Sequence, residues 1–164
     1  MGSESTEIKK ALTLVDQGDH ESALQCLESL ARGGSAAARF YKGLILRKLD
    51  DTARAVEVFR SLSREYVSNE LASLGLFHSL LNEGAVGLAF EEMKRFLADF
   101  DSASYLEILN GFLTDNDRLY VERDDFLMDP QVLSTLIDGI RDLCVSNPEL
   151  LDDLKIRGDT LGKV

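Results

Sequence analysis

The sequence predicts an all-α fold, a solenoid of three antiparallel helix pairs. Three alanines, Ala23, Ala55 and Ala89, stand 32 and 34 residues apart, each inside a similar stretch of sequence. In the helical pattern that precedes each stretch, a leucine recurs at the same two spacings: Leu14, Leu46 and Leu80. A period near 34 residues with two helices per unit is typical of helical repeat proteins. The chain also holds only two prolines in 164 residues, which leaves long segments free to form helices.

Turn-forming residues divide the first 98 residues into six helical segments. They stand at Gly18, Gly33-Gly34, Asp50-Asp51, Ser68-Asn69 and Gly84. The helices predicted between them span residues 5–17, 20–32, 35–49, 52–65, 69–82 and 85–98. In each, apolar residues recur at i, i+3, i+4 and i+7, the spacing of an amphipathic helix.

The repeat period is lost after residue 98. Ser102 can cap a helix through residue 113, and Asp129-Pro130 is a good start for another through residue 144. A last helix is expected over 147–156, and residues 114–128 are expected to form an ordered loop against the body. Because a solenoid needs a cap at its end, residues 100–164 are predicted to be an acidic helical cap of two to three helices in the same globular unit.

The spacing of small and large residues resembles the tetratricopeptide repeat (TPR). Small residues, Ala11 and Gly43, lie where this family packs its two helices together, and Ala23, Ala55 and Ala89 lie where an alanine opens its second helix. The large residues that follow are Leu27, Phe59 and Met93, and then Leu30, Leu62 and Phe96. The resemblance covers residues 4–98 as repeats of about 4–34, 36–67 and 70–99, and it implies a right-handed solenoid.

The sequence also departs from the family pattern. The aromatic residue usual early in the first helix is replaced by Glu7, Arg39 and Ser73, and Phe77 stands where the third repeat should have a small residue. No proline closes any unit. We therefore expect divergent repeats with altered packing around the third one.

In TPR-like stacks the first helix of each repeat lines a groove that binds a partner's peptide or helix. The resemblance places nine residues there: Ile8, Leu12, Val15, Phe40, Leu44, Arg47, Leu74, His78 and Leu81. Seven of the nine are apolar, more than a solvated groove should tolerate. Either an apolar helix of a partner lies there, or the chain's own C-terminal helices fold back into it.

The charge pattern limits the class of partner. The net charge is −11, and residues 99–164 carry 15 acidic against 6 basic residues. This disfavours nucleic acid and anionic membranes, which need clusters of Lys and Arg, and permits a basic protein partner. The clamp of lysine and asparagine with which some repeat proteins grip the acidic tails of chaperones is absent, since Ile8, Leu12 and Tyr41 stand among the corresponding residues.

The sequence offers little for catalysis. Its two histidines, His20 and His78, have no cysteine or acid at ligand spacing, and the acidic stretch from Asp115 lacks the glycine and glutamate of a calcium-binding loop. No phosphate-binding loop, nucleophile elbow or zinc motif is present. We expect no enzyme activity, no cofactor and no metal.

These observations favour a protein that binds one cognate partner. The most concrete hypothesis is a bacterial immunity protein that neutralises a secreted, basic toxin. A secretion chaperone and an adaptor subunit of a larger assembly are the alternatives, and a homo-oligomer is possible. No apolar run approaches the roughly 20 residues of a membrane span, and no secretory signal opens the chain. We therefore expect a cytoplasmic location.

Overall fold

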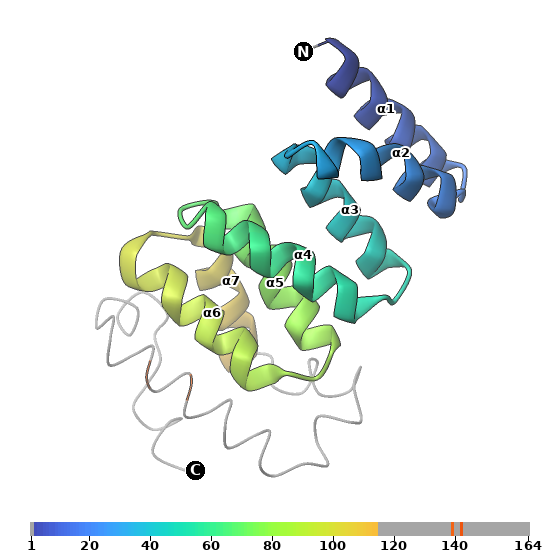
Figure 1. Ribbon diagram of the computed structural model, residues 1–164. Helices are drawn as coiled ribbons and strands as arrows, with labels where there is room; N and C mark the ends of the chain where they lie inside the picture. Colours follow the sequence, from blue (N-terminus) through green and yellow to red (C-terminus); the bar gives the residue numbers. More distant parts are fainter. Residues whose placement is uncertain (1, 115–138, 140–141, 143–164) are drawn as a thin grey trace. The chain divides into compact units, whose positions relative to one another are not determined.

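The computed structural model describes residues 2–114, 139 and 142, and in this part of the chain it is all-helical. Its helices are α1 (Gly2–Asp16), α2 (His20–Arg32), α3 (Ala36–Lys48), α4 (Thr52–Glu65), α5 (Glu70–Asn82), α6 (Val86–Asp99) and α7 (Ala103–Thr114) (Figure 1). The predicted loop 114–128 and the predicted helices 129–144 and 147–156 lie outside the described residues, apart from residues 114, 139 and 142. No described helix is long and apolar enough to cross a membrane.

The chain divides into two compact units, Met1–Glu83 and Gly84–Val164. The division falls between α5 and α6, the two helices expected to form the third repeat. The predicted repeat boundaries stay a prediction.

Side-chain caps define where most of these helices begin. Asp19, Ser35, Asp51 and Asn69 each accept a hydrogen bond from the backbone N–H three residues later, at the starts of α2, α3, α4 and α5. Ser102 does the same before α7, with Tyr105 N donating to its Oγ at 3.0 Å. These bonds satisfy N–H groups that a helix start leaves unpaired, at a gain of about 1 kcal/mol each.

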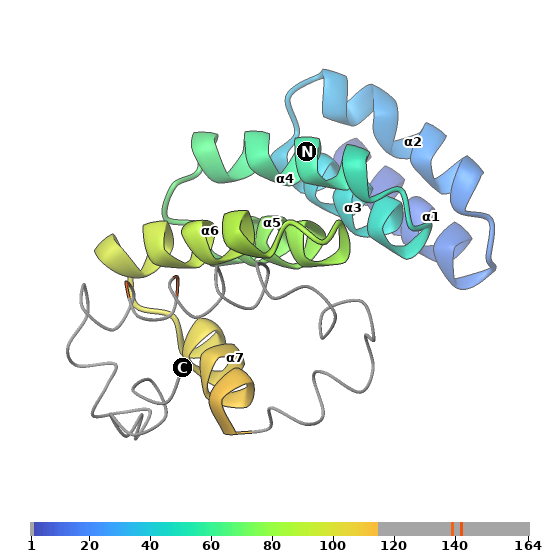
Figure 2. The same ribbon diagram turned by 90° about the horizontal axis from the view of Figure 1, so that it is seen from below.

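In the first unit, consecutive helices pack as neighbours, and α3 also contacts α5. Figure 2 shows α2 and α4 on one side of this unit, with α3 and α5 on the other. This is the repeat-like arrangement of a TPR-like solenoid, and it confirms the predicted fold class.

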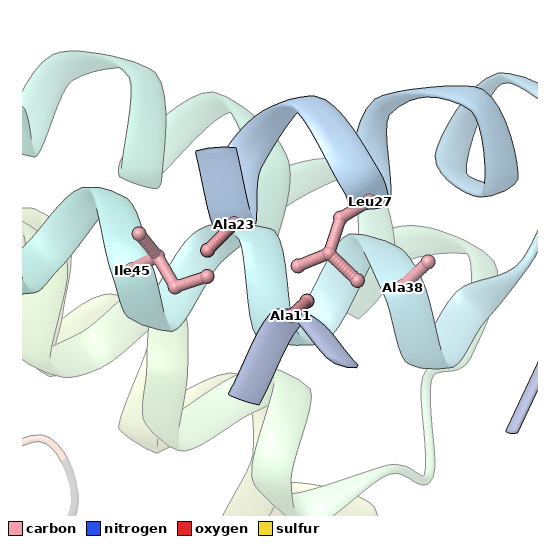
Figure 3. Packing of buried hydrophobic residues seen from close by; sticks show 5 residues of the cluster. All are labelled: Ala11, Ala23, Leu27, Ala38 and Ile45. Carbon is pink, nitrogen blue, oxygen red and sulfur yellow. The ribbon is translucent and has the colours of Figure 1, made fainter. Parts of the chain in front are cut away.

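Small side chains bring the first three helices together. Five buried residues, Ala11, Ala23, Leu27, Ala38 and Ile45, form one cluster from α1, α2 and α3 (Figure 3). Three of the five are alanines with no exposed surface. Because an alanine keeps two helix axes close, the predicted role of Ala11 and Ala23 in helix packing is confirmed.

A single aromatic ring fills the space between α3, α4 and α5. Phe59 on α4 is completely buried, and its ring lies between Gly43 on α3 and Gly75 on α5. A Cβ atom at Gly43 would lie 2.7 Å from the ring, and one at Gly75 would lie 2.4 Å from it. Neither distance is compatible with ordinary packing, so both helices need glycine there.

Gly75 is a residue that the repeat spacing does not identify. The spacing places the small residue of the third repeat at position 77, where Phe77 stands, fully buried. In the structure, α5 approaches the Phe59 ring closely two residues earlier, at Gly75. The Ser79 hydroxyl donates to the Gly75 carbonyl at 2.7 Å on the same helix.

The second unit has an aromatic core of its own. Ala89, Phe90, Met93 and Phe96 of α6 are buried, and the Phe96 ring lies 5.9 Å from that of Tyr105 on α7. Two described residues of the C-terminal region lie beside α6. A Cβ atom at Gly139 would lie 3.2 Å from Cβ of Phe90, and Asp142 accepts a hydrogen bond from Lys94 at 3.5 Å.

Candidate functional site

The nine predicted groove residues, called the inner face below, all belong to the first unit. They come from α1, α3 and α5. Leu44 is the most exposed of them, at 36%, and the other eight are half-buried. None of the nine is fully buried, whereas Ala11, Ile45 and Leu76 on the same three helices are. The inner face therefore lies at the surface of the unit, immediately outside its core.

Inner-face residues of α1 pack against the alanine cluster, and Phe40 on α3 packs against the buried Phe59 ring. Ile8 and Val15 pack against the alanine cluster that α1 shares with α2 and α3. Phe40 meets Phe59 edge to face, with ring centroids 5.8 Å apart. Phe40 therefore packs on a core side chain, while Leu44, one turn later on α3, is 36% exposed.

The two cationic positions of the inner face lie close enough to influence each other. Arg47 is on α3 and His78 is on α5, and these two helices are in contact. Burial lowers the pKa of His78 below its ordinary value of 6.5, and the positive charge of Arg47 lowers it further. Burial also lowers the pKa of Arg47, whose guanidinium remains charged because its ordinary value is so high.

The lowered pKa of His78 has a measurable consequence. In an Arg47→Gln variant, the loss of the neighbouring charge is expected to raise the pKa of His78, because protonation no longer places two cations together. An NMR titration of the ring Hε1 signal measures it, and His20→Gln assigns the signal by leaving one histidine. An unchanged pKa would contradict the pairing.

The sign of the linked stability follows from the same shift. Folding favours neutral His78, so its contribution to stability is present above its unfolded pKa near 6.5. That contribution is lost as the pH falls below 6.5 towards the folded pKa, because the unfolded chain then binds the proton more readily.

The basic residues of the second repeat are neutralised unevenly. Arg39 donates to Glu65 at 2.6 Å and to Ser61 at 2.7 Å, both on α4. Lys42 donates to Glu28 on α2 at 2.6 Å. Arg47, by contrast, has no ion pair with any residue that the structure describes, and its Nε atom is buried without a hydrogen-bond partner there.

The described residues contain no group of histidine, cysteine or acidic side chains that could hold a metal ion. Cys26, half-buried on α2, is a free thiol.

A family model of the tetratricopeptide repeat matches residues 37–68. This segment holds α3 from its second residue, α4 and the turn after it, and it includes both Gly43 and Phe59. No curated protein and no solved structure gives a match to the chain. Repeats of this kind indicate protein–protein interaction. The match over one helix pair and the packing of the helices together support a TPR-like repeat protein.

Proposed function

We propose that the chain is a non-enzymatic binding protein that holds one cognate partner on its inner face and thereby neutralises or escorts it. The observation that carries the proposal is the partial exposure of seven apolar side chains on α1, α3 and α5 of one compact unit. Several partly exposed apolar side chains on corresponding helices of one compact unit favour an interaction site over a solvated face. The repeat architecture supports it, because such repeats present extended binding surfaces.

Within this class, we propose an immunity protein against a secreted bacterial toxin. The excess of 29 acidic over 18 basic residues supports this choice, because an acidic protein attracts a basic one. Escort of a secreted substrate and docking into a larger assembly use the same inner face and are the other outcomes of the test.

The sharpest single substitution on the inner face is Leu44→Glu. Leu44 is the most exposed residue of the inner face, at 36%, so a charge there should leave the fold intact while it opposes apolar contact. We expect binding of the partner to weaken at least about tenfold, as for an interface residue whose loss costs more than 1 kcal/mol. Phe40→Glu is the less suitable change, because Phe40 packs on Phe59.

The experiment is protection of a bacterial host by co-expression. The gene next to that of the chain in its host genome is co-expressed with it as the candidate toxin, and growth is compared for wild type, Leu44→Glu and Leu49→Glu. Leu49 is 44% exposed but lies outside the inner face, which makes it a matched control. Circular dichroism checks that all three are equally helical. Full protection by Leu44→Glu would remove the inner face from the proposal, and no protection by wild type would reject the immunity function.

A further inference from the structure

The inner face carries positive charge and no acid, although the chain as a whole is acidic. Besides its seven apolar residues it holds only Arg47 and His78. Helix α3 contains four basic residues and no acidic one. Because Arg39 and Lys42 are paired with glutamates and the pKa of His78 is lowered, Arg47 is the positive charge that the inner face keeps in a chain with net charge −11.

Within the described part of the chain, Arg47 is the inner-face cation without an ion-pair partner. Arg39 and Lys42 on the same helix are paired with Glu65 and Glu28. The buried Nε of Arg47, in contrast, donates to no described residue. A buried N–H without an acceptor is unfavourable, and more so in a charged group. The side chain as a whole is only half-buried, so a ligand carboxylate that approaches its accessible part supplies the counter-charge that the described residues do not.

We infer that the inner face binds a protein segment that places one carboxylate, from an aspartate or a glutamate, on the Arg47 guanidinium between flanking apolar side chains. This inference rests on the proposed docking role of the inner face and names the chemistry of its partner. The planar guanidinium matches a carboxylate by two parallel hydrogen bonds, and the pair strengthens in a site that apolar side chains shield from water. Phe40 and Leu44 on α3, with Leu74 and Leu81 on α5, receive the apolar residues.

The makeup of the surface selects a protein segment over other anions. A nucleic acid needs several Lys and Arg contacts to its phosphates, and here one uncompensated guanidinium stands among seven apolar side chains. An apolar segment with a single acid complements that pattern. The partner can still be basic overall, because the pairing concerns one residue of the segment that docks.

The test is a selection of peptides on the immobilised full-length chain. A phage-displayed library of random 12-residue peptides is selected on wild type, Leu44→Glu, Arg47→Gln, Arg47→Glu and the control Lys48→Gln. Lys48 is an exposed cation next to Arg47 and outside the inner face. Wild type and Lys48→Gln should enrich peptides with one acid at a fixed place among apolar residues. Arg47→Gln should lose the acid, and Arg47→Glu should replace it by lysine or arginine.

Affinities of one selected peptide then quantify the pair. Changing its acid to the amide, or Arg47 to Gln, should each weaken binding by about 10- to 100-fold, the range for a hydrogen bond to a charged group. Together the two changes should weaken it no further, because either one removes the whole interaction. Equal helicity and equal melting temperatures for all variants exclude misfolding as the cause.

The outcomes separate this inference from the proposed function. Suppose the enriched peptides are apolar, contain no acid, and lose binding to Leu44→Glu but not to Arg47→Gln. That result would overturn the proposed carboxylate contact and leave the docking surface in place. A concentration-dependent dimer that Leu44→Glu abolishes would also overturn it, because a second copy would then cover the face. Absence of any enriched peptide that depends on Leu44 would overturn both.

Discussion

Replacing Phe59 by alanine is expected to lower the free energy of unfolding of the first unit by about 3–5 kcal/mol, the cost of emptying a buried aromatic site. The side chain has no exposed surface, and its ring extends from α4 to contact both α3 and α5. Domains are stable by only about 5–15 kcal/mol in total. The variant should therefore be close to unfolding at room temperature.

Urea denaturation followed by circular dichroism measures this loss, and amide hydrogen exchange locates it. The fastest new exchange should appear in α3, α4 and α5. Val67→Ala is the control, since Val67 is 51% exposed and its truncation should change stability by no more than about 0.5 kcal/mol. A Phe59→Ala loss as small as that of the control would show that the ring does not hold these helices together.

Replacing Gly75 by valine is expected to destabilise the same unit by about 3 kcal/mol, the upper end of the cost of overpacking. Its Cβ would lie 2.4 Å from Cδ1 and Cε1 of Phe59. The ring cannot retreat, because Gly43 holds its other side at a spacing where even a Cβ would clash. Helix propensity favours valine over glycine by a few tenths of a kcal/mol, which is too little to offset the clash.

A double-mutant cycle isolates the contact. Phe59→Leu combined with Gly75→Val should cost less than the sum of the two single changes, by at least about 1 kcal/mol, because the smaller side chain vacates the space. Ala37→Val, at an exposed position of α3, measures the cost of valine in a helix without a clash and should stay below about 0.7 kcal/mol. Additive effects of the two changes would contradict the close packing.

The helix boundaries follow closely from the sequence because their signals are local. The predicted spans 20–32 and 52–65 agree with α2 and α4 at both ends, and the starts of α3, α5 and α6 differ by one residue. Asp51 and Asn69, which cap α4 and α5, are among the turn-forming residues that the sequence shows between the helices, and Ser102 caps α7 as predicted. The start of α1 is wrong by three residues, since no capping residue precedes Gly2 and nothing local marks that end.

The contacts of the inner face depend on how far each helix is rotated, and the repeat spacing does not determine that rotation. It places Leu44 and Arg47 on α3 but gives no sign that Arg39 and Lys42 are paired while Arg47 has no partner among residues 2–114, 139 and 142. Gly75 escapes detection for the same reason. The glycine itself is visible, but the 34-residue register points to position 77. Gly75 can be predicted to face Phe59 only if α5 is allowed to rotate about its axis away from the orientation that the repeat register implies.

The ring of Phe59 also acts as a spacer. Because it fits between glycines of α3 and α5, its thickness sets the distance between the helix that carries Phe40, Leu44 and Arg47 and the helix that carries His78. A fully buried residue, which no partner can contact, thus determines the spacing between α3 and α5 at the inner face. Changes in the volume of this one side chain, such as Phe59→Leu or Phe59→Met, should alter which partner segments fit while every contacting residue stays the same.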